Sequence, residues 1–88
     1  LVEAMAEAGR KAGLDAELAM KLARQTVCGA GELLYQSDLP AEQLRRNVTS
    51  PNGTTAAALE VLMADDGIQP VMDKAVAAAK RRSEELAG

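Results

Sequence analysis

The sequence predicts an all-α protein, a small helical domain of about four helices plus a short one. Among 88 residues, 18 are Ala and 11 are Leu, against 6 Val, 1 Ile, 1 Tyr and no Phe or Trp. Good helix formers therefore outnumber the β-branched and aromatic residues that favour strands. Apolar residues also recur at spacings of three and four, and Gly or Pro lies between these stretches. No internal repeat or linker interrupts them, so we expect residues 1–88 to form one domain.

The first two helices are placed by apolar spacing and by the residues between them. Residues 1 to about 12 carry an apolar face and end before Gly13, a typical C-terminal stop. Asp15 is a candidate N-cap for a long helix over residues 16–36. The long helix has a wide apolar stripe, which comprises Leu18, Ala19, Leu22, Ala23, Val27, Ala30, Leu33 and Leu34.

Two glycines, Gly29 and Gly31, lie in the middle of the long helix. Each costs about 1 kcal/mol relative to Ala, so we interpret them as permitting the close approach of a second helix. A phosphate-binding loop is the alternative interpretation. It is disfavoured because no strand precedes these glycines and the third glycine of such a loop is absent.

Three further helices follow. Pro40 marks the start of a short helix of two turns. A helix after Thr55 is expected to run to a stop near Gly67, and the last helix to run from close to Pro70 to about Leu86. Its apolar stripe is expected to be buried and comprises Val71, Met72, Ala75, Val76 and Ala79.

Composition excludes several classes of site. With Cys28 as the only cysteine and no His, the chain lacks a Cys/His metal site, an imidazole base and a disulfide scaffold, and we expect no metal. A single thiol is typical of a reducing compartment, so we expect a cytoplasmic location. No apolar run has the roughly 18 residues of a membrane span, and no signal peptide is recognisable, so we expect no membrane partner. Leu1 lies inside an expected helix, which suggests that a longer chain precedes it.

The charge pattern argues against nucleic acid as a partner and in favour of self-association. The formal net charge is −3, and the densest cations, Lys80 to Arg82, are followed at once by Glu84 and Glu85. This pattern is typical of a solvated helix face, and it disfavours a helix-turn-helix DNA binder. A domain this small without large aromatic side chains buries little apolar area, so we expect it to associate with itself.

The chemistry changes between Asn47 and Leu59, where no residue is charged. This segment carries four hydroxyls and a Pro-Asn-Gly turn, and it leads into a predicted helix; the hydroxyl residues are Thr49, Ser50, Thr54 and Thr55. Free amides at a helix N-terminus bind a carboxylate or phosphate without Lys or Arg. The residues alone also allow an ordinary turn, in which a Thr caps the helix.

The run from Val48 to Thr55, read V-T-S-P-N-G-T-T, resembles the signature loop of the pyrroline-5-carboxylate reductase family, whose pattern is approximately V-T-S-P-G-G-T-T followed by a helix. The Ala- and Leu-rich stretches on both sides are similar to the family's helical domain, so the resemblance covers essentially all 88 residues. Asn52 stands where the family has the first glycine of a pair. Because Asn tolerates positive φ, we expect the loop to keep its backbone path.

The resemblance implies that residues 1–88 are the carboxyl-terminal helical dimerisation domain of an oxidoreductase that reduces 1-pyrroline-5-carboxylate to L-proline. It implies a homodimer or higher homo-oligomer of interlocking subunits. NADPH or NADH would bind mainly to an amino-terminal nucleotide-binding domain, so this chain alone would have no cofactor site and no activity. Ser50, Gly53, Thr54 and Thr55 would hold the substrate carboxylate, and the hydroxyl of Thr55 would lie near the ring nitrogen as the catalytic group. The alternative function is a non-catalytic helical oligomerisation module.

Overall fold

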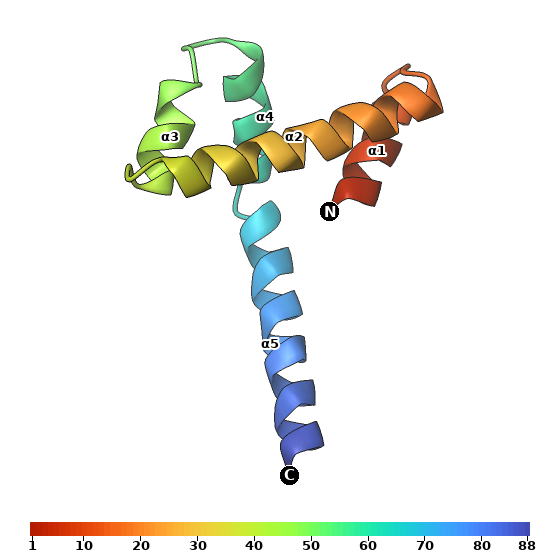
Figure 1. Ribbon diagram of the computed structural model, residues 1–88, viewed down its shortest axis with the longest axis vertical. Helices are drawn as coiled ribbons and strands as arrows, with labels where there is room; N and C mark the ends of the chain where they lie inside the picture. The colour runs from red at the N-terminus through yellow and green to blue at the C-terminus, as the bar shows by residue number, and fades with distance from the viewer. The chain divides into compact units, whose positions relative to one another are not determined.

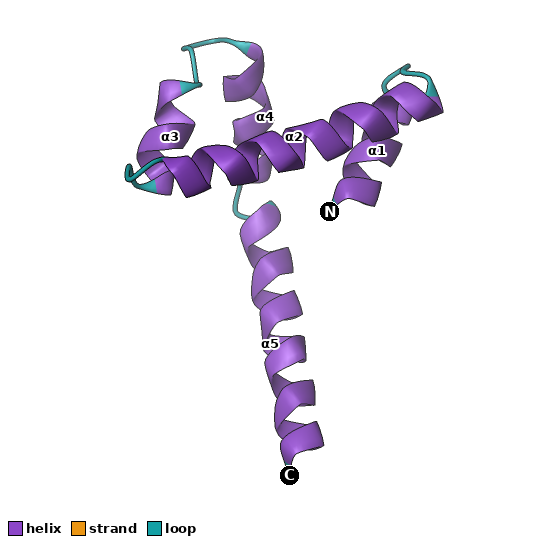
Figure 2. Ribbon diagram, in the orientation of Figure 1, coloured by secondary structure: helices purple, strands orange, loops and turns teal.

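The computed structural model describes all 88 residues and contains five helices and no strand (Figures 1 and 2). The all-α prediction is therefore confirmed, with α3 as the short helix. The helices are α1 (Val2–Lys11), α2 (Ala16–Gln36), α3 (Ala41–Asn47), α4 (Thr54–Leu62) and α5 (Ile68–Ala87).

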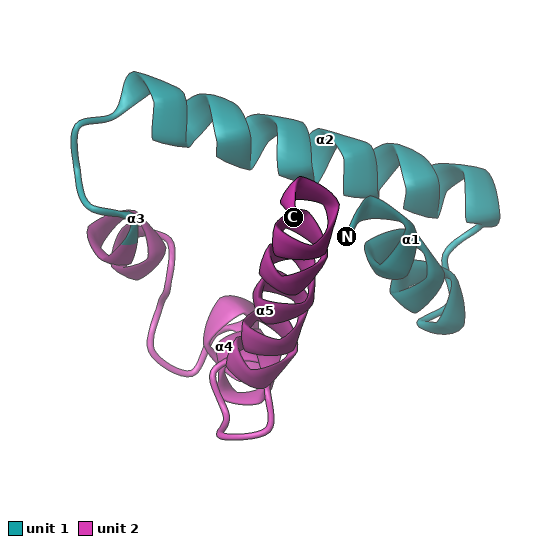
Figure 3. Cartoon of the chain, turned by 90° about the horizontal axis from the view of Figure 1, so that it is seen from below, with its two compact units in different colours: residues 1–41 teal, residues 42–88 magenta.

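The chain divides into two compact units, which Figure 3 shows in different colours. Unit 1 spans Leu1–Ala41 and holds α1 and α2. Unit 2 spans Glu42–Gly88 and holds α4, α5 and all of α3 except its first residue. The expectation of one domain over residues 1–88 stays a prediction.

The turn between α1 and α2 has the geometry that the sequence predicts. Gly13 has a φ of 114°, a backbone conformation that glycine adopts without steric cost. Its N–H donates to the carbonyl of Arg10 (3.0 Å), and the N–H of Leu14 donates to the carbonyl of Gly9 (3.1 Å). These two bonds form a Schellman motif, which satisfies carbonyls at the end of α1.

The N-terminus of α2 is capped by Asp15, as predicted. Its Oδ2 accepts hydrogen bonds from the N–H groups of Glu17 (3.2 Å) and Leu18 (3.4 Å). Two donors of the first helical turn, which have no partner inside the helix, are thereby satisfied. The observed bounds of α2 match the predicted ones.

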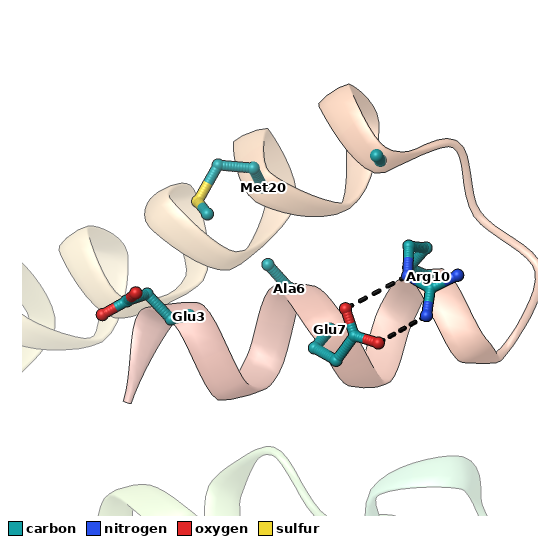
Figure 4. Close-up of a pocket in the computed structure, with 6 residues that line it drawn as sticks. Glu3, Ala6, Glu7, Arg10 and Met20 are labelled. Carbon is teal, nitrogen blue, oxygen red and sulfur yellow. Dashed lines mark hydrogen bonds and ion pairs between the residues drawn. The ribbon is translucent and has the colours of Figure 1, made fainter.

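Helices α1 and α2 pack against each other through small side chains. Ala6 of α1 and Ala19 and Ala23 of α2 are the buried residues of the chain, and Figure 4 shows Ala6 on the face of α1 that looks toward α2. A Cβ atom added at Gly9 would lie 3.3 Å from the Cβ of Ala19. The crossing is therefore close, but each alanine contributes only one methyl group to the core.

Larger apolar side chains stay exposed on both long helices. The apolar stripe of α5 was expected to be buried, and for the single chain this expectation is wrong: Val71, Met72 and Val76 are 63%, 49% and 62% exposed. Within unit 2, no helix packs on α5 as α1 packs on α2. On α2, Leu33 and Leu34 are likewise about half exposed.

The glycines in the middle of α2 have open space around them. No atom of the chain lies within 4 Å of a Cβ built on Gly29 or Gly31. Within unit 1, α1 therefore does not come close to either glycine. The interpretation that they permit a close helix approach stays a prediction.

The junction between α4 and α5 differs from the sequence-based expectation. Helix α4 ends at Leu62 rather than near Gly67, and Gly67 is the N-cap of α5. A Cβ atom on Gly67 would lie 2.3 Å from the carbonyl oxygen of Leu62. Because the chain turns back against the last carbonyls of α4, only glycine fits. Pro70 lies in the first turn of α5, where its missing N–H costs no helical hydrogen bond.

We predict that Gly67→Ala lowers the free energy of unfolding by about 1 to 3 kcal/mol, because the new methyl group overlaps backbone atoms that cannot rotate away. Urea denaturation followed by circular dichroism measures this change. Asp65→Ala is the matched control, since Asp65 is exposed and its side chain makes no hydrogen bond or ion pair. Equal stability of Gly67→Ala and the unmodified protein would contradict the prediction.

Candidate functional site

The candidate site is the loop of residues 48–53 together with the N-terminus of α4, all within unit 2 (Figure 1). Residues 50–53 form a tight turn, in which the N–H of Gly53 donates to the carbonyl of Ser50 at 3.0 Å. Pro51 occupies the second position of this turn, and Asn52 occupies the third with a φ of 62°. Proline followed by a residue of positive φ is the signature of a type II turn.

Asn52 is the only residue other than glycine with a positive φ. The expectation that Asn52 tolerates a positive φ is therefore confirmed. The polar side chain of Asn makes the left-handed region less costly than it is for most residues. It is exposed and makes no hydrogen bond within the chain.

Gly53 is the N-cap of α4, with φ −85° and ψ −178°. These angles are open to any residue, so a close contact explains the glycine: an added Cβ would lie 3.2 Å from the carbonyl oxygen of Ser50. Because Gly53 has no side chain, no hydroxyl or carboxylate caps the helix. The tight turn thus disfavours a capping side chain at this position.

Three backbone amides at the start of α4 are consequently free. The first hydrogen bond of the helix joins the N–H of Ala57 to the carbonyl of Gly53 (3.1 Å). The N–H groups of Thr54, Thr55 and Ala56 precede it and have no acceptor within the chain. The amide of Gly53 does not join them, because the turn uses it. These amides carry the positive end of the helix dipole.

The hydroxyls of the segment fall into two groups. The Thr49 hydroxyl donates to the carbonyl of Arg45 at 2.6 Å and is thus engaged by the chain. The hydroxyls of Ser50, Thr54 and Thr55 make no hydrogen bond within the chain. Ser50 and Thr54 are exposed, and Thr55 is half-buried. The structure therefore leaves free the three hydroxyls that the sequence assigns to the site.

No charged side chain belongs to the segment from Asn47 to Leu59. The pKa shifts of the chain lie elsewhere, on α1: the hydrogen bonds from Arg10 lower the pKa of Glu7, and Glu7 raises that of Arg10. Both groups are exposed at the rim of a shallow pocket between α1 and α2 (Figure 4).

Two hollows in the surface of the chain lie in unit 1. One lies between α1 and α2 (Figure 4), and the other is lined by Val2, Arg24, Gln25, Val27 and Cys28. Neither of these two hollows includes a residue of the loop. No group of His, Cys, Asp and Glu side chains is arranged to hold a metal ion. No helix is long and apolar enough to cross a membrane.

The role of Thr49 was missed by sequence reasoning, which counted its hydroxyl among those suited to an anion. The signal was available, since Thr hydroxyls near a helix end often bond to the carbonyl four residues earlier. The position of Thr49 just after α3 meets that condition. Its side chain holds the loop instead of facing a ligand.

We predict that Asn52→Ala lowers the free energy of unfolding by about 1 kcal/mol, because Ala has a Cβ but no polar group that eases a positive φ. Asn52→Gly should stay within about 0.5 kcal/mol of the unmodified protein, since glycine removes the strain but gains freedom in the unfolded chain. Thermal denaturation of both variants measures the difference. Equal stability of the two variants would show that the left-handed conformation is not populated.

Comparisons with known proteins show which family the chain resembles. Residues 1–86 match the family model described as "Pyrroline-5-carboxylate reductase dimerisation". Pyrroline-5-carboxylate reductase of Pseudomonas aeruginosa is 45% identical over 87 residues, which cover 99% of this chain and 32% of the relative. The enzyme of Mycobacterium leprae is 44% identical and is covered over 35% of its length, against 98% of this chain.

A solved structure shows the same fold. Pyrroline carboxylate reductase of Plasmodium falciparum, solved with NADP bound, matches with a TM-score of 0.89 and 36% identity, over 99% of this chain and 33% of that one. The chain thus spans about a third of the length of the relatives it matches. With a family model that matches nearly every residue, this chain belongs to the pyrroline-5-carboxylate reductase dimerisation family.

Proposed function

We propose that this chain is the dimerisation and substrate-binding domain of an NAD(P)H-dependent reductase that converts 1-pyrroline-5-carboxylate to L-proline. Family membership and relatives that carry this enzyme's name support the proposal. The observation that carries it is local. Three free amides and three unpaired hydroxyls gather at the N-terminus of α4, in a segment without charged side chains. This arrangement suits a small carboxylate bound between the start of α4 and the preceding residues 48–53, the substrate loop.

In this proposal, the substrate carboxylate lies against the amides of Thr54 and Thr55 and the hydroxyl of Ser50. Amides at a helix N-terminus stabilise an anion through directed N–H groups and the helix dipole. Gly53 contributes by having no side chain, which leaves the first turn of α4 open to the ligand. All four residues that the sequence assigns to the substrate site thus have a physical role.

A neutral cradle has a chemical advantage for this substrate. Hydride adds to a C=N bond more readily when the nitrogen is protonated, and the protonated iminium places a positive charge close to the carboxylate. Arg or Lys beside the carboxylate would oppose that charge, whereas backbone amides hold the anion with partial charges only. The substrate loop therefore binds the carboxylate without destabilising the iminium.

Thr55 is the residue we assign to the reacting group. Its half-buried hydroxyl has no partner in the chain and is available to hydrogen-bond the ring nitrogen. An unperturbed hydroxyl is a weak general acid, so its contribution is to orient the ring and stabilise charge at the nitrogen. Positioning of this kind depends on the geometry of α4 more than on acidity.

NADPH or NADH is the reductant implied by the family, and the residues of this chain do not fit a dinucleotide. A dinucleotide cradle needs a glycine-rich turn between a strand and a helix, and this chain has no strand. We therefore place the nucleotide on the part of the protein that corresponds to the rest of the relatives' length. The chain by itself is expected to be inactive. The exposed thiol of Cys28 suits a reducing compartment, and we place the enzyme in the cytoplasm.

The partner we propose is a second copy of the chain. The buried residues are three alanines, whereas both long helices present Leu, Val or Met side chains to solvent. Burial of such side chains is the main favourable term in folding. A non-catalytic oligomerisation module would share this dimer, but its loop would bind no ligand.

We predict that the chain forms a dimer at micromolar concentration, with an interface above about 2,000 Å² in total, as obligate dimers have. Folding and association should be coupled, so the melting temperature should rise with protein concentration. Light scattering and thermal melts at several concentrations test both statements. A folded monomer at micromolar concentration would contradict them.

We predict that Thr55→Val in the enzyme that includes a nucleotide-binding domain lowers kcat about 5- to 150-fold, because a hydrogen bond worth about 1 to 3 kcal/mol in the transition state is lost. Val keeps the β-branched shape, so the dimer should persist. Steady-state kinetics measures kcat and KM, and proline as a competitive ligand reports carboxylate binding. If the hydroxyl binds ground and transition state equally, KM rises instead.

Thr26→Val is the matched control for that experiment. It also removes a threonine hydroxyl, one that donates to the carbonyl of Leu22 within α2 at 2.7 Å. Its kcat and KM should stay within about twofold of the unmodified enzyme, since the change touches no residue of the loop. Unchanged kcat and KM in a well-folded Thr55→Val dimer would remove Thr55 from the mechanism.

A further inference from the structure

We propose that Thr49 is a positioning residue, which holds the substrate loop in its binding conformation without touching the substrate. The inference rests on the proposed function, because it assumes that the loop binds the substrate carboxylate. Thr49 itself is half-buried, whereas its neighbours Val48 and Ser50 are exposed. It is therefore the point at which the start of the loop is attached to the rest of unit 2.

Two hydrogen bonds make this attachment. The Thr49 hydroxyl donates to the carbonyl of Arg45 at 2.6 Å, and the Thr49 N–H donates to the carbonyl of Arg46 at 3.1 Å. Both acceptors are carbonyls of the last turn of α3, which have no helical partner of their own. The bonds thus satisfy the end of the helix and fix the direction in which the chain leaves it.

The rest of the loop is held by little else. Besides the two bonds of Thr49, the loop before α4 contains the bond from the Gly53 N–H to the Ser50 carbonyl. Ser50 lies between these two attachments and has no hydrogen bond of its own side chain. Its hydroxyl is placed by Thr49 on one side and by the turn on the other. Loss of the Thr49 hydroxyl bond would leave only the backbone bond to Arg46 at this end of the loop, so Ser50 would be held less firmly while the turn and α4 stay intact.

The expected consequence is a loss of substrate affinity without a loss of chemistry. Thr55 lies in α4, beyond the turn, so the group assigned to the ring nitrogen keeps its place. Ser50 loses its fixed position, and each binding event then has to order the loop. The cost of ordering a flexible group on binding reduces affinity.

Steady-state kinetics of the dimeric enzyme with its nucleotide-binding domain tests this proposal. Thr49→Val, which keeps the β-branched shape, should raise KM for 1-pyrroline-5-carboxylate about threefold to tenfold, the effect of one hydrogen bond. Its kcat and its KM for the nucleotide should change less than about twofold. Thr49→Ser keeps the donor and should restore KM to within about twofold. Thr26→Val, which removes the same kind of bond inside α2, should leave KM unchanged.

Distinct outcomes overturn this inference and the proposed function. The positioning role is wrong if Thr49→Val leaves KM unchanged while Thr55→Val impairs the enzyme. It is also wrong if Thr49→Ser is as impaired as Thr49→Val, because the retained hydroxyl donor would then fail to restore substrate binding. Impairment of Thr26→Val equal to that of Thr49→Val would show a general loss of stability. If Thr49→Val, Ser50→Ala and Thr55→Val all keep normal kinetics, the loop is not the substrate site and both proposals fail.

Discussion

Burial of large apolar side chains is the constraint on which both units of this chain depend, because a single copy buries only three alanines. Alanine contributes about one methyl group of apolar area, far less than a buried Leu or Val. The closeness of α1 and α2 at Gly9 and Ala19 increases contact but not buried area. The exposed Leu, Val and Met side chains of α2 and α5 therefore carry apolar area whose burial would contribute further stabilising free energy. A second copy of the chain, as proposed above, makes that free energy available.

The candidate site is built from backbone groups and hydroxyls rather than from charged side chains, and one tight turn makes this possible. The turn of residues 50–53 places Gly53 so close to Ser50 that a side chain at the N-cap would meet the Ser50 carbonyl. The helix then begins without a cap, which leaves its first amides open. The N-terminus of α2 differs, because the side chain of Asp15 accepts hydrogen bonds from the corresponding amides. The first amides of a helix have no partner within it, so a capping side chain occupies them in α2, whereas those of α4 stay available to a ligand.

The hydroxyl groups of the candidate site differ in whether they form a hydrogen bond within the chain. The hydroxyl of Thr49 donates a hydrogen bond to the end of α3, whereas the hydroxyls of Ser50, Thr54 and Thr55 make no hydrogen bond within the chain. The backbone amides divide in the same way, since that of Gly53 closes the turn and those of Thr54 and Thr55 remain free. Amides and hydroxyls that are hydrogen-bonded within the chain fix the shape of the loop, and those without such bonds are available to bind a ligand. Positions that look equivalent in sequence thus have different effects on stability and on binding.

Features that depend on neighbouring residues were determined by the sequence alone. The bounds of α2, the Asp15 cap, the positive φ of Gly13 and of Asn52, and the free hydroxyls at the start of α4 all follow from groups within about four residues. The resemblance of the loop to a known family likewise needed only a short run of residues.

Tertiary structure decided what depends on atoms brought together in space. The end of α4 at Leu62, the close contact of Gly67 with the end of α4, and the exposure of the α5 stripe belong to this group. Periodicity marks which face of a helix is apolar, but whether that face is covered depends on other helices, and here on helices that a single copy of the chain does not supply.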